Sequence, residues 1–156
     1  MDQIIIFCAK YLFFLVVVIA FVYWLKLAKR QKIEMIFFGL ITLAIAFVLA
    51  KLGGALFYDA RPFVTDHIVS LFPYVADNGF PSDHALFSAV IAVTVYATSK
   101  KWGLVLGGLA VLVGISRVLA HVHHPVDIIA SLVFAVLAGL AAYFLTPKII
   151  RFAKKQ

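Results

Sequence analysis

The chain has 156 residues, of which 65% are hydrophobic and only 13% are charged, and its mean hydropathy is +1.08. A water-soluble domain of this size needs more charged surface, so the composition excludes one and indicates a polytopic membrane protein with a single domain over residues 1–156. The net charge of +7 comes from short basic clusters between apolar runs, which favours topology determinants over a nucleic-acid surface.

Long apolar segments follow one another along most of the chain, and crossing the hydrocarbon core takes about 20 helical residues. We therefore expect an all-α membrane bundle of about five transmembrane helices, at Ile4–Leu25, Met35–Phe57, His84–Thr98, Trp102–Leu119 and Val126–Leu145. One long polar and aromatic loop, Tyr58–Ser82, separates the second helix from the third.

Basic residues gather on one side of this predicted bundle. They are Lys26, Lys29, Arg30, Lys32, Lys100, Lys101, Lys148, Arg151, Lys154 and Lys155. By the positive-inside rule that side is cytoplasmic, which places the N-terminus outside and the C-terminus inside. The opposite, outer side receives all five histidines and most of the carboxylates, so the candidate catalytic groups are expected there.

Three short stretches place ionisable groups at the ends of apolar helices, where charge is costly unless it is used. They are Arg61-Pro62, then Pro81-Ser82-Asp83-His84, then Ser116-Arg117 followed by His123 and Asp127. Each stretch alone has an ordinary explanation. An arginine at a helix end can be an anchor that reaches the headgroups, and Ser82 with Asp83 can simply cap the third helix.

Read together, the stretches predict a phosphoryl-transfer site. Arg61 and Arg117 can bind phosphate oxygens, and backbone N–H groups at the helix that opens near Ser82 add donors. His123 supplies a nucleophilic imidazole whose other ring nitrogen can donate to Asp127, four residues on.

A second imidazole completes the predicted chemistry. His84 can protonate the leaving oxygen and later deprotonate the attacking water. His121, His123 and His124 are too close in sequence for all three to face one ion on a regular helix, so we expect neither a metal site nor a cofactor.

At these residues the sequence resembles the type 2 phosphatidic acid phosphatase (PAP2) superfamily, whose pattern is K-x6-R-P, then P-S-G-H, then S-R-x5-H-x3-D. The third motif matches at every fixed position, and Arg61-Pro62 match the end of the first. The pattern's lysine falls at Gly54. The nearest lysine, Lys51, either reaches up towards the phosphate or pairs with another group.

Asp83 stands where the pattern has glycine. P-S-D-H resembles the undecaprenyl diphosphate phosphatase branch, and there Asp83 could act on water or orient His84. The resemblance implies a bacterial plasma-membrane enzyme that hydrolyses undecaprenyl diphosphate to the monophosphate and phosphate on the outer face. Its partners are then a lipid phosphate substrate and membrane lipid, with neither nucleic acid nor a protein partner implied.

Two alternatives stay open on the sequence. The motifs do not separate this substrate from phosphatidylglycerophosphate or phosphatidic acid, because the head-group chemistry is shared. A small membrane transporter is the alternative of another class, since Lys51 and a histidine cluster also suit ion movement. The spans hold few polar residues besides Lys51, which favours a catalytic site at one face.

Overall fold

The structure is a computed structural model that describes residues 1–66 and 68–153. Lys154 and Lys155, named above among the basic residues, and His67, one of the five histidines, lie outside the described residues. Within the described part of the chain the regular elements are six helices. They are α1 (Asp2–Leu25), α2 (Lys29–Leu56), α3 (Pro62–Thr65), α4 (Asp83–Tyr96), α5 (Lys100–Leu119) and α6 (Pro125–Ala153).

Four of these helices are long and apolar enough to cross a membrane, namely α1, α2, α5 and the part of α6 from Pro125 to Thr146. Their outward-facing side chains are apolar, as at Phe21, Leu40 and Leu140, each more than half exposed. A surface of this kind suits lipid rather than water. The chain is therefore a multi-pass membrane protein by helix length and composition.

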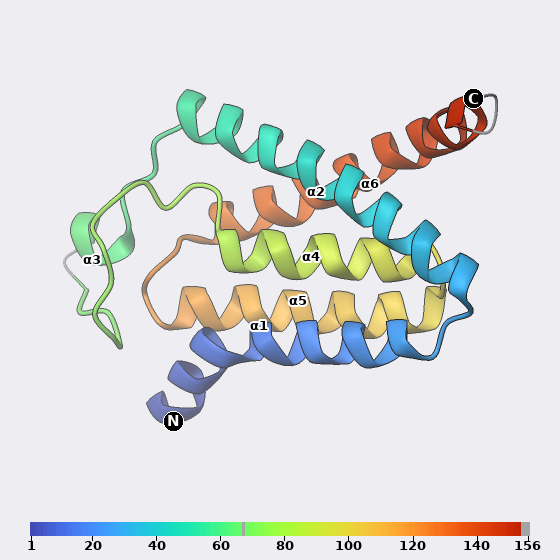
Figure 1. Cartoon of the computed structure of the whole chain (residues 1–156). Coiled ribbons are helices and arrows are strands. Elements are labelled where there is room, and N and C mark those ends of the chain that lie inside the picture. Colours follow the sequence, from blue (N-terminus) through green and yellow to red (C-terminus); the bar gives the residue numbers. More distant parts are fainter. Residues whose placement is uncertain (67, 154–156) are drawn as a thin grey trace.

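Helix α4 is the central element of the bundle. It lies between α1 and α5 on one side and α2 and α6 on the other (Figure 1), and it packs against all four. Most of its side chains are buried, among them Leu86, Val90 and Val95. With 14 residues it is about 21 Å long, shorter than the roughly 30 Å hydrocarbon core, so it is a short apolar helix rather than a fifth full-length span.

Glycines let the long helices approach one another closely. A Cβ atom on Gly114 of α5 would collide with Ile128 of α6, and one on Gly139 of α6 would collide with Val93 of α4. Small residues at such crossings are the usual device for packing helices in lipid, where burial of apolar surface gives little driving force.

The ends of the bundle differ. Figure 1 shows the N-terminus, α3 and the start of α4 at one end, with the α1–α2 and α4–α5 connections and the C-terminus at the other. Pro125 begins α6, a position where the missing N–H costs nothing. Ser99 caps α5 at the far end by accepting from the Trp102 N–H at 3.5 Å. The end with α3 gathers the motif residues.

Candidate active site

The turn after α5 carries His123 back towards the bundle. The Val122 N–H donates to Arg117 O at 3.2 Å and the His121 N–H donates to Val118 O at 2.9 Å, which together make a Schellman motif. His121 has a φ of 60°, the left-handed conformation that this motif needs and that usually falls to glycine. The turn ends α5 sharply, and α6 begins two residues after His123.

His123 and Asp127 form a buried pair, 3% and 0% exposed, with Nδ1 of the histidine 3.0 Å from Oδ2 of the aspartate. With its proton on Nδ1, His123 donates to Asp127, and the lone pair of the ring is on Nε2. Burial, followed by the positive charges of Arg61 and Arg117, lowers the pKa of His123 to about 3. The imidazole is therefore neutral at physiological pH, the form in which it is a nucleophile.

Arg61 lies beside this pair. Its Nη1 donates to Val122 O at 2.7 Å and lies 3.2 Å from Nε2 of His123, while its Nε donates to Asp77 at 2.8 Å. The guanidinium also stacks over the ring of Tyr74, 4.4 Å from its centroid. Arg61 is thus held from three sides with its charge next to the imidazole.

Arg117 approaches the same ring from α5. Its guanidinium lies 4.7 Å from the Tyr74 centroid, and Nη1 donates to Ala9 O of α1 at 3.3 Å. Among the described residues, Nε and Nη2 of Arg117 find no hydrogen-bond partner, although the side chain is 1% exposed. Buried guanidinium donors are rarely left unsatisfied unless they bind a ligand.

Ser82 adds a third unsatisfied donor. It is the N-cap residue of α4, but its side chain makes no cap hydrogen bond, and its fully buried Oγ is without a partner in the described part of the chain. The backbone there is tied to α6, because the Ser131 hydroxyl lies within hydrogen-bond distance of Ser82 O, at 2.9 Å, and Asp127 O, at 2.7 Å. The helix N-terminus and the free hydroxyl together suit an anion.

His84 lies in the first turn of α4, half-buried, with its ring 5.8 Å from that of Phe13 on α1. Asp83 and Lys51 do not join the buried cluster. Both line a separate pocket of about 420 Å³ between α2 and the start of α4. Lys51 is exposed, with its ammonium 5.3 Å from the centroid of the Phe47 ring.

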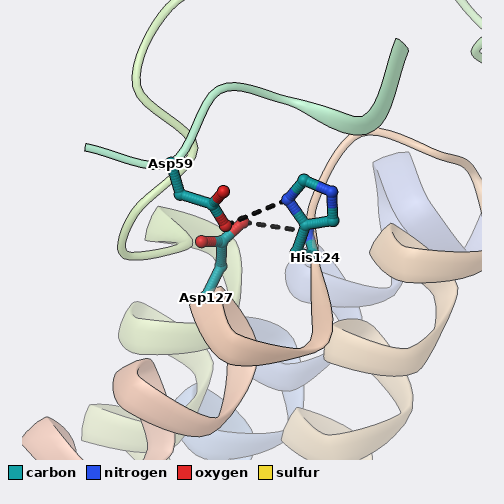
Figure 2. Close-up of side chains that lie close together, drawn as sticks. All are labelled: Asp59, His124 and Asp127. Atoms are coloured by element: carbon teal, nitrogen blue, oxygen red, sulfur yellow. Dashed lines mark hydrogen bonds and ion pairs between the residues drawn. The ribbon is translucent and has the colours of Figure 1, made fainter. Parts of the chain in front are cut away.

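His124 and Asp59 form a second histidine–aspartate pair next to Asp127. The sequence suggested His124 only as a possible metal ligand and gave Asp59 no role at the site. His124 Nδ1 lies 3.0 Å from Oδ2 of Asp59, and the His124 N–H donates to Oδ2 of Asp127 at 3.0 Å (Figure 2). Burial, and then the negative charge of Asp127, raise the pKa of Asp59. One ligand atom from each of these three residues lies within 4.8 Å of the others, a set that is chemically able to bind a divalent cation.

The other residues that sequence reasoning missed are Tyr74, Asp77 and Gly79. A Cβ atom on Gly79 would lie 3.0 Å from Oδ2 of Asp127 and 3.1 Å from Asp59 O, so any larger residue here would press on the Asp127 carboxylate. The one available signal was the position of all three in the long loop that links two motifs.

Comparisons with known proteins agree with the motifs. The family profile of the PAP2 superfamily matches residues 37–151. The chain is 31% identical over 150 residues to the Bacillus licheniformis protein named bacitracin transport permease protein BcrC, covering 96% of this chain and 73% of that protein. It is also 31% identical over 141 residues to undecaprenyl-diphosphatase BcrC of Bacillus subtilis, covering 89% and 72%.

The fold has a solved counterpart in the crystal structure of Aquifex aeolicus LpxE. The TM-score is 0.65 at 21% identity, with 91% of this chain and 84% of that chain covered. At this identity the likeness concerns the fold alone. The match of the family profile over most of the length, together with the relatives, shows that the chain belongs to the PAP2 superfamily.

Proposed function

We propose that the chain hydrolyses undecaprenyl diphosphate to undecaprenyl phosphate and inorganic phosphate through a phosphohistidine intermediate. The observation that carries the proposal is a set of buried donors near the His123–Asp127 pair, Nε and Nη2 of Arg117 and Oγ of Ser82, that find no partner among residues 1–66 and 68–153. Buried donors of this kind near a neutral imidazole suit the binding of a phosphoryl group that the imidazole can attack.

In the first half-reaction, Nε2 of His123 attacks the terminal phosphorus and forms a P–N bond. The bond from phosphorus to the bridging oxygen breaks, and His84, which takes up a proton when the anionic substrate binds, donates it to that oxygen. Arg61, Arg117 and Ser82 bind the non-bridging oxygens, and Asp127 stabilises the cationic ring through Nδ1. The product released is the lipid monophosphate.

In the second half-reaction, water attacks the phosphorus of the phosphohistidine while His84, now neutral, takes its proton. The P–N bond breaks, its electron pair returns to Nε2, and inorganic phosphate leaves. The two guanidinium groups neutralise the charge that develops on the oxygens, so the proposed route needs no metal ion.

The diphosphate substrate rests on the Asp83 form of the second motif and on the names of relatives, of which one is an undecaprenyl-diphosphatase. Phosphatidylglycerophosphate and phosphatidic acid are the alternative substrates. A membrane transporter is the alternative of another class, because the Bacillus licheniformis relative is named a transport permease. Phosphate release separates the two functions, since a transporter releases no phosphate.

We also propose that one domain spans residues 1–156, with five membrane helices including the short α4, the N-terminus outside and the site at the outer face of a bacterial plasma membrane. The α1–α2 and α4–α5 connections lie at the end of the bundle opposite the site (Figure 1), where Lys26 follows α1, Lys29 begins α2, and Lys100 and Lys101 begin α5. The positive-inside rule makes that end cytoplasmic.

The test is phosphate release by the purified protein in detergent, comparing undecaprenyl diphosphate with phosphatidylglycerophosphate, with and without EDTA. We expect His123→Ala and His84→Ala to abolish turnover while the protein still folds. His121→Asn is the matched control, because asparagine tolerates the left-handed conformation and His121 lies outside the buried cluster. Near-normal turnover by His123→Ala would refute the nucleophile, and sensitivity to EDTA would point to the Asp59–His124–Asp127 cluster.

A further inference from the structure

The catalytic cluster has a defined leaving-group side. An in-line displacement places the attacking nitrogen and the departing oxygen on opposite sides of phosphorus. Since His123 attacks and His84 protonates the departing oxygen, the rest of the substrate must lie on the side of His84. This step rests on the function proposed above.

A polar pocket lies beside the start of α4, the helix that carries His84. It has a volume of about 420 Å³ and is lined by Asp83, which precedes His84, and by Asp77, which binds Arg61 at 2.8 Å. Asn78 and Lys51 complete its polar wall, and Lys51 is its basic residue. The pocket therefore adjoins the phosphate site without being part of it.

Lys51 is placed to serve a second anion. It lies five residues, or about 7.5 Å, below the end of α2, and its ammonium lies over the face of the Phe47 ring, 5.3 Å from the centroid. Asp77 is paired with Arg61, and Lys51 has to offset the Asp83 carboxylate, which also lines the pocket and would repel a phosphate. A phosphate bound there gains the charge of Lys51 in a low-dielectric setting, where such pairs are stronger than in water.

An apolar groove continues from this pocket along the bundle. It has a volume of about 510 Å³ and lies between α1, α2 and α4, with Leu43 and Phe87 lining both spaces. Its wall also includes Phe13, whose ring contacts His84. The groove thus comes near His84 through Phe13 and runs on between apolar side chains of α1, α2 and α4.

We propose that Lys51 binds the phosphate that stays on the lipid and that the groove between α1, α2 and α4 receives the first units of its isoprenoid chain. The order of the spaces matches the order of groups in such a substrate: transferred phosphate, retained phosphate, hydrocarbon. A lipid with a single phosphate leaves Lys51 without a ligand, so this residue selects diphosphates over monophosphates.

The test of Lys51 compares two substrates with one tail, farnesyl diphosphate and farnesyl monophosphate. We expect Lys51→Met to lower kcat/KM about tenfold for the diphosphate and less than twofold for the monophosphate, and Lys51→Arg to retain most of the activity. Lys100→Met, at the far end of the bundle, is the matched control. Equal losses on both substrates would overturn the assignment, because Lys51 would then serve the transferred phosphate.

The test of the groove uses Leu43→Trp, which fills the part shared with the pocket. We expect KM for undecaprenyl diphosphate to rise about tenfold, with dimethylallyl diphosphate, a single isoprene unit, almost unaffected. Leu112→Trp adds the same bulk on the exposed face of α5 and serves as control. An unchanged KM for the long lipid would overturn the groove. If the unmodified protein hydrolyses only monophosphates, the proposed function is wrong, and the inference about Lys51 and the groove is wrong as well.

Discussion

Replacing Arg117 with lysine tests the phosphate site most directly. Arg117 holds two buried donors, Nε and Nη2, that find no partner among the described residues, and a guanidinium presents such a pair to a phosphate side by side. Lysine keeps the charge but offers a single point donor. The variant therefore loses about one charge-assisted hydrogen bond, worth about 1.5–3 kcal/mol.

If that bond acts in the transition state, kcat/KM falls about 10- to 150-fold, since each 1.36 kcal/mol is a factor of ten. The assay is phosphate release in detergent, with inhibition by orthovanadate as a measure of anion binding. Arg117→Lys also loses the contact from Nη1 to Ala9 O, so the thermal midpoint is recorded for each variant.

Arg30→Lys makes the same chemical change at a side chain that is 85% exposed and pairs with Glu34, and we expect it to leave turnover unchanged. A loss below threefold for Arg117→Lys, with unaltered inhibition by orthovanadate, would refute the role of Arg117 in binding the transferred phosphate.

Three further predictions concern the loops that hold the catalytic pair. Gly79→Ala pushes on the Asp127 carboxylate and should lower kcat about tenfold. Gly108→Ala is the control, because a Cβ there meets nothing within 4 Å, and it should leave kcat unchanged. Equal kcat values for the two variants would contradict the packing argument. Because the pKa of folded His123 is lowered to about 3 while unfolded histidine titrates near 6.5, acidification between these values favours unfolding by about 1.4 kcal/mol per pH unit. The thermal midpoint of the unmodified protein should then fall more steeply below pH 6.5 than that of His123→Gln, and parallel curves would count against a buried neutral imidazole. His121→Gly removes the conformational strain of a non-glycine residue at φ 60° and should stabilise the fold by up to about 1 kcal/mol with turnover intact. A lower thermal midpoint for this variant would show that the contacts of the His121 side chain outweigh the backbone strain.

The helices could be predicted from the sequence better than their ends. Hydropathy marks where a helix enters lipid, not where it begins, so α2 starts at Lys29 rather than Met35. The polar first turns are stabilised outside the apolar region, as by the pair between Arg30 and Glu34 at 2.8 Å. Helix α4 ends at Tyr96. Four neighbouring helices surround it, so most of its side chains contact protein rather than lipid, and its length is not set by the thickness of the bilayer.

For the candidate site, the motifs predicted which helix ends matter but not what surrounds them. Tyr74, Asp77 and Asp59 come from the long loop, where no periodicity shows which side chains turn inward. His124 neighbours the expected nucleophile, yet its pairing with Asp59 depends on contacts across 65 residues of chain. The roles of the motif residues remain predictions that the variants above test.

The Schellman motif after α5 gives the spacing of the third sequence motif a second meaning. Arg117 O accepts from the Val122 N–H, and Val122 O in turn accepts from Arg61, so the intervening backbone is itself part of the scaffold. The side chains between Arg117 and His123 are constrained as well, because Ala120 and Val122 are fully buried and His121 has a left-handed backbone, but the number of residues is fixed by the main-chain bonds alone. A one-residue insertion or deletion there would shift His123 relative to Arg61 and Arg117. The length of this backbone segment therefore sets the distance between the histidine and the two arginines.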